Sequence, residues 1–274
     1  MKPLRSLWLA LGAGLAIASF SWTLATQLSP FLPVMVVLAW GGVMRWASEQ
    51  RITPPLHPSR LSAALGAATA FGVVGVMQLA RPTSLAYALP LGVGLAMALL
   101  ALPLQELGCV ARPLLLLTIP LLPLAVSRVL AESVLAPATA AVSALLLQLA
   151  GLEALVLGRH VLLGESGVRV AGACGGTEDI AFLLAVALLL ALTQPPVVGR
   201  RFAALLLCAP VLGFATNALR VAVLAFAVQR GGWWQQQVFP FLHEGYGSLL
   251  FSLWAVAALV LVDGQLNQRR IVAS

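Results

Sequence analysis

The chain has 274 residues, of which 61% are hydrophobic and only 9% are charged, and its net charge is +7. Soluble domains carry about 25% charged residues, so this composition and the mean hydropathy of +0.99 exclude a soluble protein. The basic residues form no stripe with interleaved aromatic residues, which argues against nucleic acid as a partner. Membrane barrels would alternate polar and apolar residues. We therefore expect an all-α polytopic membrane protein, with residues 1–274 forming a single integral membrane domain.

Eight apolar segments approach the length of about 20 residues that a helix needs to cross a hydrocarbon core of about 30 Å. The predicted spans are Ser6 to Thr26, Phe31 to Ala47, Leu61 to Ala80, Ser84 to Leu104, Pro113 to Leu130, Ile180 to Gln194, Phe202 to Val223 and Gly247 to Val262. The first segment lacks a small-residue cleavage pattern, so it is predicted to be a membrane helix rather than a signal peptide.

The distribution of arginine and lysine predicts the orientation, because short cytoplasmic loops retain positive charge. With the N-terminus inside, ten of the sixteen basic residues fall at the inner ends of the spans and six at the outer ends. An even number of spans then places both termini in the cytoplasm. The segment before the sixth span lies on the outer face of the cell membrane, periplasmic or extracellular.

That outer segment does not resemble a simple span. Residues Val134 to Leu157 are apolar and helical in composition, but a proline and two polar residues interrupt them. We expect an interfacial or re-entrant helix here. A ninth span would move Arg200 and Arg201 to the outer side, against the charge rule.

A short polar and glycine-rich stretch follows the interfacial helix. His160 to Leu163 and Val168 to Ala171 are rich in branched residues and flank Gly164-Glu165-Ser166-Gly167, a pattern that predicts a small β-hairpin. The hairpin leads directly into the polar sequence Ala173 to Asp179, which contains Cys174. A thiol in such a break between apolar segments is a candidate nucleophile.

Helical rise allows Cys174 to meet two other unusual residues, Arg220 and His243. At about 1.5 Å per residue, Arg220 lies roughly 28 Å from the inner charge Arg201, and His243 roughly 30 Å from Asp263. Both distances match the thickness of the hydrocarbon core. By the same count Cys174 lies at or just above the outer boundary, so all three residues are expected at one depth.

Each of these residues also has a purely structural explanation. Cys174 is of a type often buried as a small apolar residue, Arg220 is near enough to a helix end to extend to the headgroups, and His243 fits an ordinary interfacial histidine. The neighbouring residues favour chemistry. Gly175 and Gly176 let a substrate backbone approach and leave amides for an oxyanion.

The helix that carries Arg220 has a second polar residue on the same face. Asn217 precedes Arg220 by three residues, which indicates a directed polar surface rather than an isolated charge. Cysteine, histidine and arginine together suit acyl transfer: a nucleophile, a proton carrier and a fixed positive charge. Zinc needs three or four ligands at suitable spacing, which the outer face does not offer. We expect neither a metal nor another cofactor.

Three short motifs resemble the exosortase/archaeosortase family: Ala173-Cys174-Gly175-Gly176, Asn217-Ala218-Leu219-Arg220, and His243 followed by Gly247. The resemblance implies a membrane cysteine transpeptidase whose substrates are exported proteins with a C-terminal sorting signal of a short motif, an apolar helix and a basic tail. It implies that Cys174 forms a thioester, His243 transfers protons and Arg220 supports the transition state. The acyl product would pass to a cell-surface acceptor, an amine or a lipid-linked group, with membrane lipid as a further partner.

The chain departs from the family pattern beside the cysteine. The family commonly has serine where this chain has Gly175, and an apolar residue where it has Thr177-Glu178-Asp179. An unpaired acid would oppose formation of a thiolate. We therefore expect Glu178, a supporting residue of the site, and its neighbour Asp179 to pair with Arg220 or Arg169.

A different class of protein fits the same polar residues. A transporter or membrane-assembly factor could use Cys174, Arg220 and Glu178 as a non-covalent pocket at the outer face, since intramembrane polar residues also mark transport routes. The sequence has no internal repeat and no pair of interrupted helices of the kind that transporters use. An intramembrane serine protease is disfavoured because no Gly-x-Ser-x-Gly motif with a matching histidine is present.

Overall fold

The structure, a computed structural model, divides into two compact units. It describes residues 2–26, 28–29, 31–50, 56–79, 84–193, 199–243 and 247–273. One unit comprises Met1–Leu121 and Leu192–Pro195, and the other comprises Leu122–Ala191 and Pro196–Ser274. The predicted span ends at Ala80 and Gln194 lie outside the described residues. All the candidate site residues belong to the second unit.

The first unit is helical. Its elements are α1 (Lys2–Thr26), α2 (Phe31–Gln50), α3 (Arg60–Met77), η1 (Ser84–Ala88), α4 (Leu89–Ala101), η2 (Leu104–Val110), α5 (Ala111–Leu116) and η3 (Ile119–Leu121). Helix α3 begins after Ser59, whose side chain accepts a hydrogen bond from the Ser62 amide at 3.1 Å, a typical N-cap. Apolar side chains of α1, α3 and α4 form the core, among them Leu15, Val73 and Val93.

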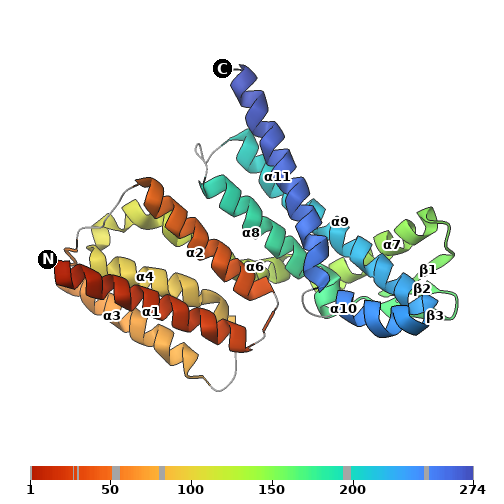
Figure 1. Ribbon diagram of the computed structural model, residues 1–274, viewed down its shortest axis with the longest axis horizontal. Helices are drawn as coiled ribbons and strands as arrows, with labels where there is room; N and C mark the ends of the chain where they lie inside the picture. Colours follow the sequence, from red (N-terminus) through yellow and green to blue (C-terminus); the bar gives the residue numbers. More distant parts are fainter. Residues whose placement is uncertain are drawn as a thin grey trace. The chain divides into compact units, whose positions relative to one another are not determined.

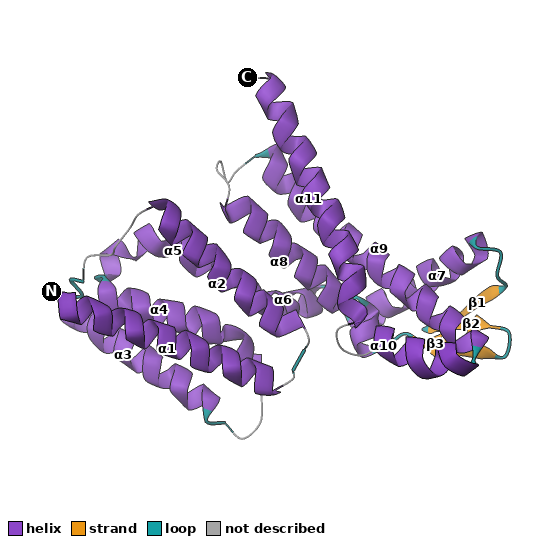
Figure 2. Ribbon diagram, viewed as in Figure 1, coloured by secondary structure: helices purple, strands orange, loops and turns teal. Residues whose placement is uncertain are grey.

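The second unit contains all the strands that the structure describes (Figures 1 and 2). Its elements are α6 (Leu122–Val129), α7 (Glu132–Leu149), β1 (Ala154–Leu157), β2 (His160–Leu163), β3 (Ser166–Arg169), η4 (Gly172–Gly175), α8 (Thr177–Thr193), α9 (Arg200–Arg230), the π-helical turn η5 (Trp234–Val238), α10 (Phe239–His243) and α11 (Gly247–Ala273). The polar stretch with Cys174 therefore lies between β3 and α8.

The predicted hairpin is present and is extended by a third strand. Strands β1, β2 and β3 form an antiparallel sheet in that order. Strand β2 has the predicted bounds, but β3 begins two residues earlier than expected because the turn consists of only Gly164 and Glu165. Gly164 has a φ of 60°, as tight hairpin turns require.

Strand β1 corrects the prediction that one helix extends from Val134 to Leu157. Helix α7 ends at Leu149, and Gly151 follows with a φ of 81°, the left-handed conformation that commonly terminates helices. The Gln148 side chain donates a hydrogen bond to the carbonyl of Ala154 at 2.7 Å. This contact fixes the reversal of the chain, so residues 154–157 pair with β2 instead of continuing the helix.

The predicted all-α polytopic membrane architecture is confirmed. Within the described residues, seven helices are long and apolar enough to cross a membrane. A bent pair, Leu104–Leu116 with Ile119–Val129, would make an eighth. The predicted span from Pro113 to Leu130 is thus broken rather than continuous. The seven include α7, where the sequence predicts an interfacial helix. Helix α8, where the sequence predicts a span, has only 17 described residues. Length and composition alone therefore do not decide which of α7 and α8 crosses the membrane.

Helices α7 and α9 pack against each other beneath the sheet. Ala136, Ala140 and Ala144 are spaced four residues apart on α7 and are buried in one cluster with Val221 and Ala225 of α9. Small residues at this spacing allow two helices to approach closely. The Ser143 hydroxyl donates to the Ala218 carbonyl of α9 at 2.8 Å. The sheet packs on the same cluster through residues of β1 and β2.

A buried ion pair joins the beginning of α9 to α11. Arg201 Nε donates to Asp263 Oδ1 at 2.6 Å, and its Nη2 donates to Oδ2 at 3.0 Å. The two side chains are only 5% and 6% exposed. Such bidentate pairs are geometrically specific. The ion pair places Arg201 and Asp263 side by side. The sequence predicts that both residues lie at the inner ends of their spans.

Replacing Asp263 by alanine should destabilise the second unit, because it leaves the Arg201 charge buried without its carboxylate. Breaking a buried pair costs about 3 to 5 kcal/mol of unfolding free energy, and we expect the midpoint of thermal unfolding in detergent to fall by about 6 °C or more. The matched control is Glu49→Ala, which removes the exposed Arg45–Glu49 pair and should cost less than about 1 kcal/mol. Equal midpoints for the two variants would contradict this expectation.

Candidate functional site

Cys174 lies in the short η4 turn between the sheet and α8. Its amide donates to the Ala171 carbonyl at 3.1 Å, and its carbonyl accepts a hydrogen bond from Asn217 Nδ2 of α9 at 2.9 Å. Asn217 is fully buried, and Cys174 is only 6% exposed. The main chain of the cysteine is therefore fixed from two sides, which fixes the position from which its side chain projects.

The two glycines that follow Cys174 differ in what they contribute. Gly176 has a φ of 96°, and a Cβ atom there would lie 2.9 Å from Asn217 Nδ2, so both conformation and space require glycine. A Cβ at Gly175 would meet only Glu132 Cγ, at 3.7 Å. The Gly175 carbonyl accepts a hydrogen bond from Thr139 of α7 at 3.2 Å. The Cβ atom of the serine that the resemblance leads us to expect at this position would therefore find room.

Arg220 is held by a buried carboxylate. Its Nη1 lies 3.4 Å from Asp179 Oδ2, and the hydroxyl of Ser252 on α11 donates to Asp179 Oδ1 at 2.7 Å. All three side chains are at most 3% exposed. A charge buried in this way must be compensated, and here the arginine and the acid compensate each other. The network joins α8, α9 and α11.

Gly213 allows α8 and α9 to approach closely enough for this pair. A Cβ at Gly213 would lie 2.8 Å from the Cα of Ile180 and 2.9 Å from the carbonyl oxygen of Asp179. These are backbone atoms, so relieving the clash would require a shift of helix α8 itself. The glycine therefore sets the distance between Asp179 and the helix that carries Arg220.

The same guanidinium group reaches the candidate nucleophile. Arg220 Nη2 lies 3.7 Å from Cys174 Sγ, within hydrogen-bonding distance for sulfur. The group therefore bridges a carboxylate on one side and the thiol on the other. A fixed positive charge at this distance stabilises negative charge that forms on the sulfur or on an atom bonded to it.

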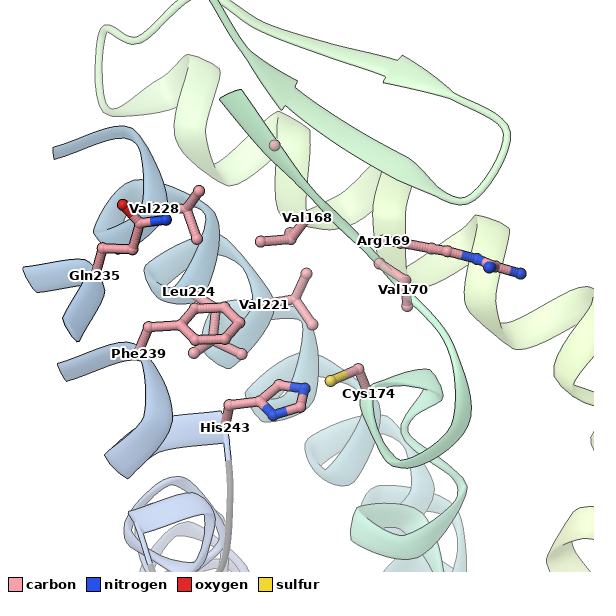
Figure 3. Close-up of a pocket in the computed structure, with 11 residues that line it drawn as sticks. Val168, Arg169, Val170, Cys174, Val221, Leu224, Val228, Gln235, Phe239 and His243 are labelled. Carbon is pink, nitrogen blue, oxygen red and sulfur yellow. The ribbon is translucent and has the colours of Figure 1, made fainter. Parts of the chain in front are cut away.

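A cavity of about 430 Å³ lies between His243 and Cys174. The cavity is lined by both Cys174 and His243, and Figure 3 shows the imidazole ring and the sulfur pointing toward each other. The ring stacks on Phe239, one turn earlier in α10, with centroids 5.1 Å apart. This stacking orients the histidine, whose own side chain is exposed.

The remaining walls of the cavity are mainly apolar. Val221, Leu224 and Val228 of α9 form one side, and the segment from Gly167 to Val170 forms another. The volume lies in the range of small-molecule and peptide sites, about 300 to 1,000 Å³. A polar reacting group at Cys174 would thus lie at one end of an apolar chamber.

Glu178 is a supporting residue that does not line the cavity, as is also true of Gly175, Gly176 and Asn217. It is half-buried in the first turn of α8 and is not among the cavity residues. Of the two acids expected to pair with an arginine, Asp179 makes the contact with Arg220. Acidic residues in a first helical turn also interact favourably with the helix dipole. This interaction is sufficient to explain an acidic residue at position 178.

Several contributing residues were not identified from the sequence. Ser252 contacts Asp179 across 73 residues of sequence, and Thr139 contacts Gly175 across 36 residues. The segment from Gly167 to Val170 was predicted only as part of a hairpin and not as a wall of the site. Polar residues at helical spacing on an apolar helix, such as Thr139 and Ser143, were the available signal. Among the described residues, no group of three or more His, Cys, Asp or Glu side chains is placed to hold a metal ion.

Comparison with known families assigns the chain. The family model of the transmembrane exosortases (Exosortase_EpsH) matches residues 22–260, most of the chain. The chain belongs to the transmembrane exosortase family. The family prediction from the three motifs is thereby confirmed. No curated protein and no solved structure matches this exosortase family member significantly.

Alanine substitutions at the two glycines of this exosortase should have different effects. Gly176→Ala is expected to lower the unfolding free energy by at least about 1 to 3 kcal/mol, the cost of a left-handed non-glycine residue, because the methyl group also meets Asn217. Gly175→Ala should stay within about 1 kcal/mol of the parent protein. Thermal unfolding in detergent measures both, and a Gly176→Ala protein as stable as Gly175→Ala would contradict the described geometry.

Proposed function

We propose that this exosortase is a membrane-embedded cysteine transpeptidase. It cleaves the C-terminal sorting signal of exported proteins and transfers the acyl product to an acceptor at the cell surface. Family membership supports a sorting transpeptidase in general. The observation that carries the assignment to specific residues is the contact of Arg220 with the Cys174 thiol, 3.7 Å, beside a cavity that Cys174 and His243 both line.

In the first half-reaction, Cys174 Sγ attacks the carbonyl carbon of the scissile peptide bond. The thiol proton passes to His243, and a bond forms between sulfur and carbon. Arg220 stabilises the negative charge that develops on the carbonyl oxygen. When the carbon–nitrogen bond breaks, the leaving amine takes the proton back from His243. The products are a thioester on Cys174 and the released C-terminal fragment.

In the second half-reaction, the acceptor attacks the thioester carbonyl. An amine or a hydroxyl group loses its proton to His243 as it attacks, and the carbon–sulfur bond breaks. The sulfur then recovers the proton, so the enzyme returns to its starting state. Asp179 and Ser252 contact neither reactant in this scheme. They keep the Arg220 guanidinium directed at the sulfur.

We further propose that the site lies on the outer face of the membrane, with both termini in the cytoplasm. We take the Arg201–Asp263 pair as the inner end of α9, as the charge rule predicts, and Ala218 lies about 26 Å further along the helix at 1.5 Å per residue. The Ser143 hydroxyl of α7 bonds to Ala218 of α9, and Val221 and Ala225 of α9 lie in the same buried cluster as the alanines of α7. By the same rise Val221 and Ala225 lie about 30 and 36 Å from Arg201, which supports placing α7 near the outer edge of a core about 30 Å thick, as an interfacial helix.

Replacing Cys174 by serine or alanine should abolish processing of a co-expressed reporter whose C-terminus carries a candidate motif, an apolar helix and a basic tail. The physical reason is loss of the nucleophile. Immunoblotting of full-length and shortened reporter measures the outcome, and we expect at least a 100-fold decrease in the rate. A non-covalent transporter or assembly factor would instead keep its function with serine at this position.

The two other cysteines provide matched controls for this experiment. Cys109 is exposed in η2, and Cys208 is half-buried in α9, and neither lines the cavity. Cys109→Ser and Cys208→Ser should process the reporter at the parental rate. Processing that survives in Cys174→Ala, or is lost equally in all three variants, would overturn the assignment of the nucleophile.

Labelling with a membrane-impermeant maleimide should test the orientation. Leu157 in β1 is 70% exposed, so Leu157→Cys in a chain without the native cysteines is expected to be labelled in intact cells. A chain that keeps Cys109 as its single cysteine should be labelled only after the cells are permeabilised. The reverse pattern would place the site on the cytoplasmic face.

A further inference from the structure

Strand β3 is an edge strand whose free side borders the cavity. Within the described residues it pairs only with β2, and the segment from Gly167 to Val170 lines the cavity together with Cys174. Unpaired strand edges are templates for another extended chain. Here the edge leads, within a few residues, to the proposed nucleophile.

The free hydrogen-bonding groups of β3 can be assigned from its register. The Val170 amide donates to the Arg159 carbonyl at 2.8 Å, which directs Val170 toward β2. Successive residues of an antiparallel strand alternate in this respect. The amides and carbonyls of Gly167 and Arg169 are therefore directed away from β2.

These two residues line the cavity with their main chains. Gly167 has no side chain, and Figure 3 shows the Arg169 side chain extending away from the cavity. In the same view the side chain of Val168 is directed toward Val221 and Leu224. The cavity thus offers backbone donors and acceptors along one side and apolar side chains along the other. This combination is complementary to an extended peptide with uncharged, apolar side chains.

We propose that the segment of the exported protein next to the scissile bond binds as a fourth strand on β3. Its backbone pairs with Gly167 and Arg169, and an apolar side chain of the segment occupies the chamber formed by Val168, Val221 and Leu224. This arrangement presents the scissile carbonyl to Cys174 at the end of the strand. The inference rests on the proposed function and names how that site recognises its substrate, by backbone pairing and an apolar contact.

Comparison of Arg169→Pro with Arg169→Ala tests the backbone pairing. Both variants lose the arginine side chain, but only proline also lacks the amide hydrogen that would pair with the substrate. Proline is tolerated on edge strands where the missing amide does not pair, and the Arg169 amide does not pair with β2. We expect Arg169→Pro to process the reporter at least ten-fold more slowly than Arg169→Ala, with the same unfolding midpoint. Equal processing rates in two folded variants would overturn the proposal.

Disulfide trapping tests the same contact without catalysis. Arg169→Cys is combined with Cys174→Ala, Cys109→Ser and Cys208→Ser, and single cysteines are placed at successive positions of the reporter motif. A paired strand should cross-link at alternate positions, because successive side chains point to opposite faces. Uniform cross-linking, or none at any position, would overturn the proposal even if Arg169→Pro unfolds. Alternating cross-links would support strand pairing even if Cys174→Ala still processed the reporter, so the two proposals fail separately.

Discussion

A buried ion pair between Arg220 and Asp179 is the interaction on which the site depends. The two side chains are 3% and 2% exposed, in a protein in which only 9% of residues are charged. A buried charge without a partner is strongly unfavourable, so each side chain holds the other in place. Ser252 occupies the second carboxylate oxygen. The guanidinium is thereby left with Nη2 directed at Cys174 Sγ, before any substrate is present.

Glycines make this arrangement sterically possible. Gly213 brings the backbone of α8 against α9 at Asp179, and Gly176 turns the chain after the cysteine beside Asn217. The departure from the family pattern at Thr177-Glu178-Asp179 thus has a physical account, because Asp179 is the acid that compensates Arg220. The departure at Gly175 needs no compensation, since a Cβ atom there meets only Glu132 at an ordinary contact distance.

The sequence predicted the parts of the site that follow from depth and local pattern. Helical rise placed Arg220 and His243 at one level, and the structure brings both to the surroundings of Cys174. Contacts between distant segments were not predictable. Ser252 is separated from Asp179 by 73 residues, and a lone serine on an apolar helix gives no signal of its partner. The end of α7 was misplaced because the apolar composition of residues 154–157 fits a helix or a strand equally, and the glycine at 151 decides between them.

The most direct test of the account is mass spectrometry of the enzyme after incubation with the sorting-signal reporter. The account predicts an adduct on Cys174 with the mass of the reporter's N-terminal fragment, bound as a thioester that hydroxylamine removes. Arg220→Ala should form this adduct at least ten-fold more slowly. Cleaved reporter without any adduct on Cys174, or an adduct on another residue, would contradict the central claim that Arg220 and Cys174 form the reacting centre.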